Sequence, residues 1–276
     1  MSENCTHDCA TCSANCASRE NAGPQLSQPK ATTHIGKIIA VMSGKGGVGK
    51  SMVSATLACE LAKQGFKTAV LDADITGPSI PKLFGISGNP VGDDEGIFPP
   101  TSENLGIKLM STNFLLQDET QPVVWRGPVL SGMVQQFYTE VYWEDVDYMI
   151  IDMPPGTGDV PITLFQSLPV NGIIIVTSPQ ELVSMIVSKA LNMAQMVNIP
   201  VLGLVENMSY FECPDNGKRY EIFGKSHVDE TADGFGIPVL AKVPINPAIA
   251  EKSDAGKIEE VDAKWLGDAI NLIKTF

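Results

Sequence analysis

The chain has 276 residues, of which 43% are hydrophobic, and a formal net charge of -13. This length allows one large domain or two small ones, with enough apolar residues to bury a core. The negative charge argues against general DNA binding and against docking to an anionic membrane surface, because both require a basic protein surface.

No apolar run approaches the roughly 20 residues of a membrane-spanning helix. The first residues also lack the basic and apolar regions of a signal peptide. We therefore expect a cytoplasmic protein. In that compartment the six cysteines are metal ligands or free thiols rather than disulfides.

Residues 1–33 differ in composition from the rest of the chain. They are polar and nearly devoid of aliphatic side chains, so we expect a flexible cysteine-rich tail ahead of a domain that spans residues 34–276. Four of the six cysteines lie in this tail: Cys5, Cys9, Cys12 and Cys16. Four thiolates suit an iron–sulfur cluster, and tetrahedral zinc accepts the same set, so their spacing does not choose between the two.

A glycine-rich segment follows the apolar run of residues 37–42 and precedes a helical pattern over residues 52–64. A strand, a glycine-rich turn and a helix form the context of a phosphate-binding loop. The segment matches G-x-x-x-x-G-K-[ST] in full: Gly44, Lys45, Gly46, Gly47, Val48, Gly49, Lys50 and Ser51. In such a loop, backbone N–H groups and the helix N-terminus converge on an anion. We expect Lys50 to contact the β- and γ-phosphates and the Ser51 hydroxyl to bind Mg²⁺.

Two apolar runs end in carboxylates: residues 67–71 lead into Asp72 and Asp74, and residues 148–152 end at Asp152. Carboxylates at the carboxyl ends of parallel strands, beside a phosphate loop, are placed to hold a metal or water. The alternative that the first pair only caps a turn stays open. We expect Asp152 to hold Mg²⁺ through water, and the Gly- and Pro-rich segment after it is typical of a loop that moves with the γ-phosphate.

The alternation of strands and helices continues to the end of the chain. We expect further strands at residues 107–110, 172–177, 201–205 and 237–243. We expect further helices at residues 128–138, 181–196 and 264–275. This order predicts one doubly wound α/β domain, with helices on both sides of a mostly parallel sheet.

Three residues outside the main motifs are further candidates. Asn207 is expected to end the strand of residues 201–205 at the nucleotide edge, where its amide offers a donor and an acceptor to a base. Cys213 lies in a turn-rich segment, residues 211–217. Arg126 is either a phosphate or interface contact or a surface residue, and the sequence does not decide.

With these motifs the chain resembles the Mrp/ApbC-type iron–sulfur cluster carriers, a branch of the MinD-like P-loop ATPases. The resemblance extends over nearly everything from Gly36 onward. Besides the phosphate loop, its most specific parts are Asp72-Ala73-Asp74, Gly77-Pro78-Ser79, Trp125-Arg126-Gly127-Pro128, Asp152-Met153-Pro154-Pro155-Gly156-Thr157-Gly158-Asp159 and Glu206-Asn207-Met208-Ser209.

The resemblance implies a homodimer that binds ATP and Mg²⁺, hydrolyses ATP slowly, and passes an iron–sulfur cluster from an assembly scaffold to apo-proteins. The net charge, as argued above, favours neither nucleic acid nor membrane partners. It implies that Lys45 contacts phosphate across the ATP-bound dimer. Asp74 is then the carboxylate near the attacking water and Asp152 the one on the magnesium side. Asn207 corresponds to a residue that reads adenine.

One departure from the family concerns the cluster. Family members typically carry Cys-Pro-x-Cys in the loop after residues 209–211, and two such pairs in a dimer bridge a [4Fe–4S] cluster. Here Cys213 is followed by Pro-Asp-Asn, so a dimer offers two bridging cysteines where four are needed. The tail cysteines resemble the cysteine-rich extension of some family members. They either hold a cluster themselves or complete a site begun by Cys213, and the flexible link of residues 17–33 allows both.

Two other functions are compatible with a phosphate loop. A positioning ATPase of the MinD or plasmid-partitioning type needs a basic DNA-binding face or a basic membrane helix, and the sequence contains neither. A regulatory ATPase with zinc in its tail differs from a cluster carrier in metal content. The leading expectation is an ATP-dependent iron–sulfur cluster carrier.

Overall fold

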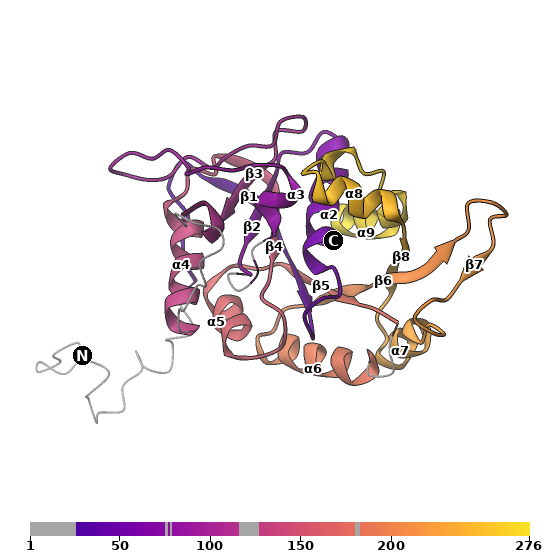
Figure 1. Cartoon of the computed structure of the whole chain (residues 1–276). Helices are drawn as coiled ribbons and strands as arrows, with labels where there is room; N and C mark the ends of the chain where they lie inside the picture. Colours follow the sequence, from indigo (N-terminus) through magenta and orange to yellow (C-terminus); the bar gives the residue numbers. More distant parts are fainter. Residues whose placement is uncertain (1–25, 75–76, 78, 116–126, 180–182) are drawn as a thin grey trace, which may run out of the picture.

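The computed structural model describes residues 26–74, 77, 79–115, 127–179 and 183–276. Within these residues, eight strands form one sheet in the order β3-β2-β4-β1-β5-β6-β7, and β8 pairs with β6 (Figure 1). Every pair of neighbouring strands is parallel except β6 with β7. The predicted mostly parallel α/β fold is confirmed.

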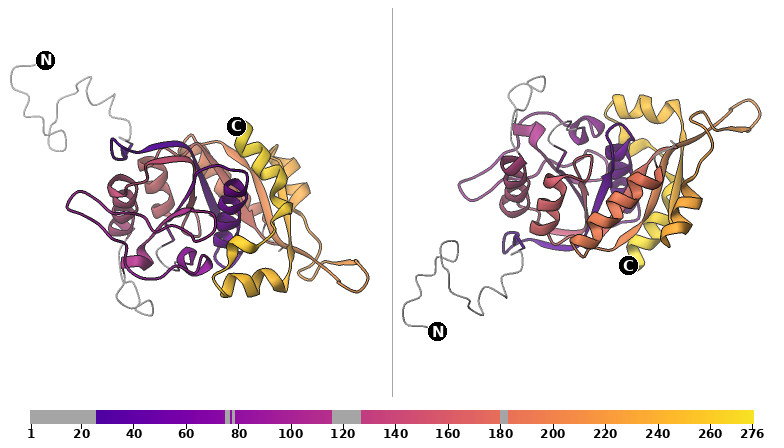
Figure 2. Two further views of the ribbon diagram at one scale, coloured as in Figure 1. Left: turned by 90° about the horizontal axis from the view of Figure 1, so that it is seen from above. Right: turned by 90° about the horizontal axis from the view of Figure 1, so that it is seen from below.

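The sheet lies between two layers of helices. The strands are β1 (His34–Ser43), β2 (Thr68–Asp72), β3 (Lys108–Ser111), β4 (Asp145–Asp152), β5 (Gly172–Thr177), β6 (Val201–Glu212), β7 (Arg219–Tyr220) and β8 (Val239–Ile245). One layer contains α2 (Lys50–Lys63), α3 (Ile80–Leu83), α8 (Pro247–Asp254) and α9 (Gly267–Thr275). The other contains α4 (Gly127–Glu140), α5 (Asp159–Ser167), α6 (Val183–Met196) and α7 (Val228–Phe235), as Figure 2 shows from above and below.

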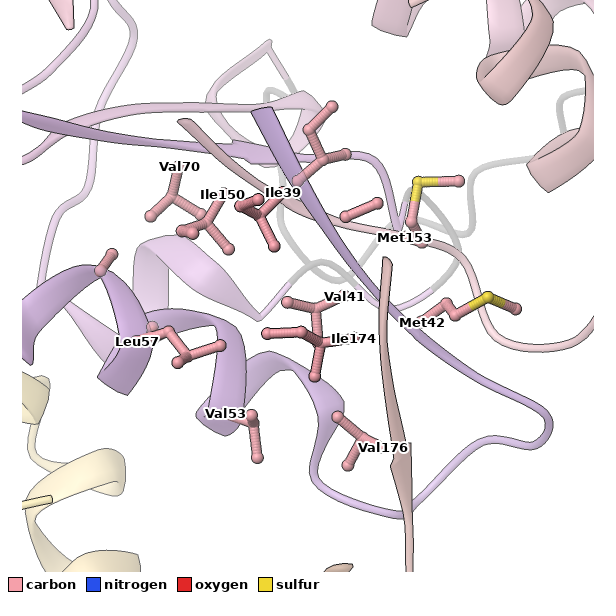
Figure 3. Close-up of a cluster of buried hydrophobic side chains, with 14 of the residues drawn as sticks. Ile39, Val41, Met42, Val53, Leu57, Val70, Ile150, Met153, Ile174 and Val176 are labelled. Carbon is pink, nitrogen blue, oxygen red and sulfur yellow. The ribbon is translucent and has the colours of Figure 1, made fainter. Parts of the chain in front are cut away.

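The core forms where the central strands meet α2. Val41 of β1 and Ile174 of β5 lie beside Val53 and Leu57 of α2, and all four are buried (Figure 3). Because these strands are covered on both faces, they appear in the sequence as continuous aliphatic runs instead of alternating patterns. This burial fixes the carboxyl ends of the strands, where the candidate site lies.

Helix α2 is buried along almost its whole length, from Lys50 to Leu61. It begins directly after Gly49, whose φ of 78° lies in the left-handed region that glycine adopts without strain. A helix that is buried on most sides must be predominantly apolar or small, and its run of Ala, Val and Leu meets that requirement. The predicted helix of residues 52–64 is therefore present and begins two residues earlier.

Strand β6 differs most from its prediction. A strand was expected over residues 201–205, with a turn-rich segment at 211–217, but β6 continues through Glu212. Asn207 therefore lies within a strand and does not end one. The polar residues in the middle of β6 are buried among hydrogen-bond partners, which allows a strand to pass through them.

Other helices and strands also differ from the expectation. The predicted terminal helix of residues 264–275 starts as the 3-10 turn Lys264–Leu266, and α9 follows, with Ala269, Ile270 and Ile273 buried. Helices α3, α5, α7 and α8 and the short strand β7 were not predicted. None of these helices is longer than nine residues, which is too short for a periodic pattern to stand out in the sequence.

The described chain begins on the surface of the domain. The Ser27 N–H donates to the carbonyl oxygen of Ser167 at the end of α5 (2.7 Å), and the Lys30 ammonium lies 4.5 Å from the centre of the Tyr142 ring. The structure describes no helix, among the residues given above, that is long and apolar enough to cross a bilayer.

Candidate functional site

The candidate site lies where three neighbouring strands end. Strands β2, β4 and β1 are adjacent, and Asp152 is in register with Asp72 on one side and with Val41 on the other. β1 ends at Ser43, from which the chain enters the glycine-rich loop and then α2. The fold therefore brings the phosphate loop and both predicted carboxylate segments to one edge of the sheet, as the sequence motifs require.

The loop has the backbone shape that its glycines permit. Gly47 and Gly49 have φ values of 79° and 78°, which side chains rarely tolerate. At Gly44, an added Cβ would lie 2.1 Å from the Cγ2 atom of Ile186. The Ser43 hydroxyl donates to the carbonyl oxygen of Lys45 (2.9 Å), which closes the start of the loop. These glycines are needed for conformation and for close packing.

Lys50 is the charged centre of the site. Only 5% of it is exposed, and its Nζ lies 2.9 Å from Asp152 Oδ1 and 3.4 Å from Asp74 Oδ2. Burial opposes the positive charge, but the carboxylates of Asp152 and Asp74 outweigh it, so the pKa of Lys50 is raised above its ordinary value. The ammonium is therefore charged across the physiological pH range.

Asp152 joins the loop to β4. Its carboxylate accepts hydrogen bonds from Ser51 Oγ (2.5 Å) and Ser54 Oγ (2.7 Å), in addition to the ion pair with Lys50, and the residue is fully buried. The Ser51 hydroxyl and the Asp152 carboxylate are hard oxygen donors of the kind that Mg²⁺ prefers. The described residues hold no group of three His, Cys, Asp or Glu side chains arranged for a metal. These two donors thus fit Mg²⁺, which usually takes its remaining ligands from phosphate and water.

Asp72 supports the site from behind, a role that the sequence motifs did not separate from that of Asp74. Its side chain accepts hydrogen bonds from the backbone N–H of Asp74 (3.1 Å) and from Ser111 Oγ at the end of β3 (2.9 Å). Burial, together with the nearby carboxylate of Asp152, raises the pKa of Asp72 well above its ordinary value. The Asp-x-Asp spacing predicted a carboxylate at this strand end, but it did not assign Asp72 this supporting role.

Asn207 reaches the loop from β6. Its Nδ2 donates to the carbonyl oxygen of Val48 (2.9 Å), and an added Cβ at Gly49 would lie 2.1 Å from the same nitrogen. The amide thus holds the loop itself, and its role as a base reader stays a prediction.

A cavity of about 430 Å³ opens at the mouth of the loop. Its walls include Lys50, Ser51, Asp74 and Pro155. Lys45 lies on the same loop and is half-buried. The cavity is therefore bordered by the predicted phosphate residue Lys50, the predicted magnesium residue Ser51 and the carboxylate Asp74.

The predicted cysteine ligands are not brought together in the described part of the chain. The tail cysteines lie outside the described residues, as does Arg126. Cys213 is half-buried at the turn between β6 and β7, where its N–H donates to the carbonyl oxygen of Lys218 (2.9 Å). It lines a groove of about 560 Å³ together with Phe211, Pro214 and Ile245. Cys59 is buried in α2, and this burial raises the pKa of its thiol to about 12.

Comparisons with known proteins agree with this geometry. A family model described as ParA, NUBPL iron-transfer P-loop NTPase, matches residues 34–273. An iron–sulfur cluster carrier protein from Clostridium perfringens is 43% identical over 93% of this chain and 95% of its own length. A nucleotide-binding protein from Archaeoglobus fulgidus, solved with ADP, is 46% identical, with a TM-score of 0.76 over 84% of this chain and 90% of that chain. The cell division protein MinD from Aquifex aeolicus, at 19% identity and a TM-score of 0.61 over 87% of this chain and 98% of its own, shares the fold.

The raised pKa of Asp72 predicts a pH-dependent gain in stability for Asp72→Asn. In the unfolded chain the carboxyl ionises near 3.8, whereas the buried carboxyl keeps its proton to higher pH. The wild-type free energy of unfolding therefore falls as pH rises above about 4, by up to about 1 kcal/mol per pH unit from this group. The neutral amide avoids this loss, so the stability of the variant relative to wild type should rise from pH 5.5 to pH 7.5 in urea denaturation.

Asp145→Asn is the matched control, because Asp145 lies at the exposed opposite end of β4 and pairs with Lys67 in solvent. An equal pH-dependent gain in Asp145→Asn would show that burial of Asp72 is not its cause. A stability difference for Asp72→Asn that stays constant between pH 5.5 and 7.5 would contradict the assignment.

Proposed function

Because the chain belongs to the NUBPL iron-transfer P-loop NTPase family, we propose that it is an ATP-binding carrier that holds an iron–sulfur cluster and transfers it to apo-proteins. The observation that carries this proposal is the phosphate loop with Lys50 buried between Asp152 and Asp74, on a chain that also contains a four-cysteine tail. We place the carrier in the cytoplasm and propose that it works as a homodimer.

Lys50 supplies the phosphate contact through an exchange of partners. Its ammonium is charged and paired with two carboxylates, so a triphosphate that enters the cavity competes with them for the same cation. When Lys50 turns to the phosphates, Asp152 and Asp74 lose part of their compensation. Lys50 would therefore bind the phosphates and, by changing partners, also alter the ion pairs of Asp152 and Asp74 when nucleotide is present.

Ser51 and Asp152 would hold Mg²⁺, which supplies charge neutralisation between the β- and γ-phosphates when it is bound. The chain's own residues do the rest. Ser54 fixes one oxygen of Asp152, and Asp72 holds the backbone N–H of Asp74. Asp74 is thereby oriented toward the cavity, where we propose that it positions the attacking water for slow hydrolysis.

We propose that Lys45 completes the site of the opposite subunit. It follows the loop's first glycine, and its chain neighbour Gly46 lines the cavity, so a second chain facing this edge would bring its own Lys45 toward the phosphates. A cation supplied in trans is worth about 10³-fold or more in phosphoryl transfer. Hydrolysis would then require dimerisation.

We propose that the transferred iron–sulfur cluster is bound by the cysteine-rich tail, residues 1–33. Cys5, Cys9, Cys12 and Cys16 provide the four thiolates that one [4Fe–4S] cluster needs, whereas a dimer provides only two through Cys213. Cys213 nevertheless lies half-buried in a groove at the end of β6, where its sulfur can join a cluster that the tail presents. We propose the tail as the main site and Cys213 as an additional ligand.

Removing the loop cation should abolish nucleotide chemistry. Lys50→Ala is expected to lower ATP turnover by at least about 100-fold, because the phosphate charge loses its buried partner. Lys50→Arg keeps the positive charge, and the variant should fold normally. Its planar guanidinium cannot occupy the position of the Lys50 ammonium, so this variant should also lose ATP turnover. Steady-state phosphate release measures both, with circular dichroism as the test of folding.

Lys67→Ala is the matched control, since Lys67 is 65% exposed and pairs with Asp145 away from the loop. It should retain wild-type turnover. Wild-type turnover in folded Lys50→Ala would show that the site is misassigned.

A mixing experiment tests the role of Lys45 in trans. Lys45→Ala and Lys50→Ala should each be inactive. The first variant lacks the Lys45 ammonium supplied by the other subunit, and the second lacks the Lys50 ammonium of its own loop. In a 1:1 mixture, random pairing gives half the dimers one intact site, so turnover should recover to about a quarter of wild type. A mixture no more active than its components would place Lys45 outside the partner's site.

Cluster loading tests the carrier function and locates the cargo. After reconstitution without oxygen, Cys5→Ser or Cys12→Ser should lower bound iron and sulfide more than Cys59→Ser does, because the Cys59 thiol is buried with its pKa raised to about 12. Iron, sulfide and zinc are measured on the same samples. Wild-type protein that takes up zinc but no iron would support a zinc-tailed regulatory ATPase, and the reverse ranking of variants would move the cluster away from the tail.

A further inference from the structure

Strand β6 connects the phosphate loop to the cysteine hairpin. Asn207 holds the loop through Val48, and six residues later the same strand reaches Cys213. The hairpin of β6 and β7 projects from the body of the fold (Figure 1). One backbone segment therefore runs from a nucleotide-loop contact to the thiol.

This connection contains a bulge. In its pairing with β8, Glu206 is opposite Lys242 and Tyr210 is opposite Pro244, so β6 uses four residues where β8 uses two. Within the bulge, Met208 has a φ of 57°, in the left-handed region that residues other than Gly, Asn and Asp rarely adopt. Bulges of this kind re-aim the strand that follows them.

A buried carboxylate holds both sides of the bulge. Glu206 is fully buried, and it accepts hydrogen bonds from Ser209 Oγ (2.5 Å) and Ser226 Oγ (3.0 Å). Ser209 is the last residue of the bulge, and Ser226 precedes α7. The bulge is thus held in one defined geometry, and the loss of any of these bonds would leave a buried polar group unsatisfied.

Beyond the bulge the strand is stiff up to the thiol. Phe211 pairs with Tyr220 of β7 and with Ile245 of β8, and Arg219 bonds Glu212 (2.9 Å). This pairing leads directly to Cys213, the residue that follows β6. A change of geometry at the bulge would reach the thiol through it.

We propose that the bulged segment of β6, residues 207–209, couples the phosphate loop to Cys213, so that nucleotide occupancy sets the exposure of the Cys213 thiol. When the loop rearranges around phosphate, the Val48 carbonyl oxygen carries Asn207 with it, and the backbone at Met208 takes up the displacement. The biological role of this coupling rests on the proposed cluster-carrier function. Its test, however, requires neither a bound cluster nor cluster transfer to an apo-protein.

The test measures the alkylation rate of Cys213 by iodoacetamide with and without Mg²⁺ and a non-hydrolysable ATP analogue. The four tail cysteines are changed to Ser, and the buried Cys59 in the same protein serves as a slow internal reference. We expect the rate at Cys213 to change by about fivefold or more, the lower range of coupling between sites. An unchanged rate, with nucleotide binding confirmed separately, would overturn the proposal.

Two substitutions at one position test the route. Met208→Gly makes the left-handed backbone unrestrained, whereas Met208→Ala removes the same side chain beyond Cβ and keeps the restraint. The nucleotide effect should fall below about twofold in Met208→Gly and persist in Met208→Ala. An effect that persists fully in Met208→Gly would show that burial by a partner subunit protects the thiol, and its loss in Met208→Ala would exclude the backbone route. Either result overturns the proposal, and neither bears on whether the tail carries a cluster.

Discussion

The site depends on the buried ion pair between Lys50 and Asp152, which joins the start of α2 to the end of β4. Removing one partner of such a pair costs about 3–5 kcal/mol, because the other charge stays buried without compensation. Around this pair Asp72 and Asp74 add two further carboxyl groups, and the raised pKa of Asp72 reduces the excess of negative charge. A triphosphate alone would restore that excess, whereas a divalent cation would offset it. This charge balance supports the proposal that nucleotide binds here together with Mg²⁺.

The phosphate loop and the buried strands were predictable because their signals are local in the sequence. Glycine spacing, a following helix and long aliphatic runs predicted that Lys50, Ser51 and Asp152 lie at one edge of the sheet. The separate role of Asp72 was not predictable, since its pKa depends on the register between β2 and β4. The length of β6 was also missed, because Glu206 and its polar neighbours read as the end of a strand. Their burial is possible only through partners that come from distant segments.

The phosphate loop and the two regions proposed to bind the cluster lie at different places on the domain. The described chain begins beside Ser167 of α5, whereas the hairpin with Cys213 projects from the opposite side of the domain in each view (Figures 1 and 2). The phosphate loop lies between them at the carboxyl edge of the sheet. If a cluster is shared by the tail and Cys213, as we propose, this separation favours its assembly from two chains of the proposed homodimer.

The burial of α2 has a consequence for how the protein matures in the cell. Because this helix fills the core from Lys50 onward, the chain cannot complete its interior without also forming the glycine turn that precedes it. Acquiring a native interior and acquiring the anion cradle are one event. A substitution that disrupts the packing of α2 is therefore expected to disturb the phosphate loop as well.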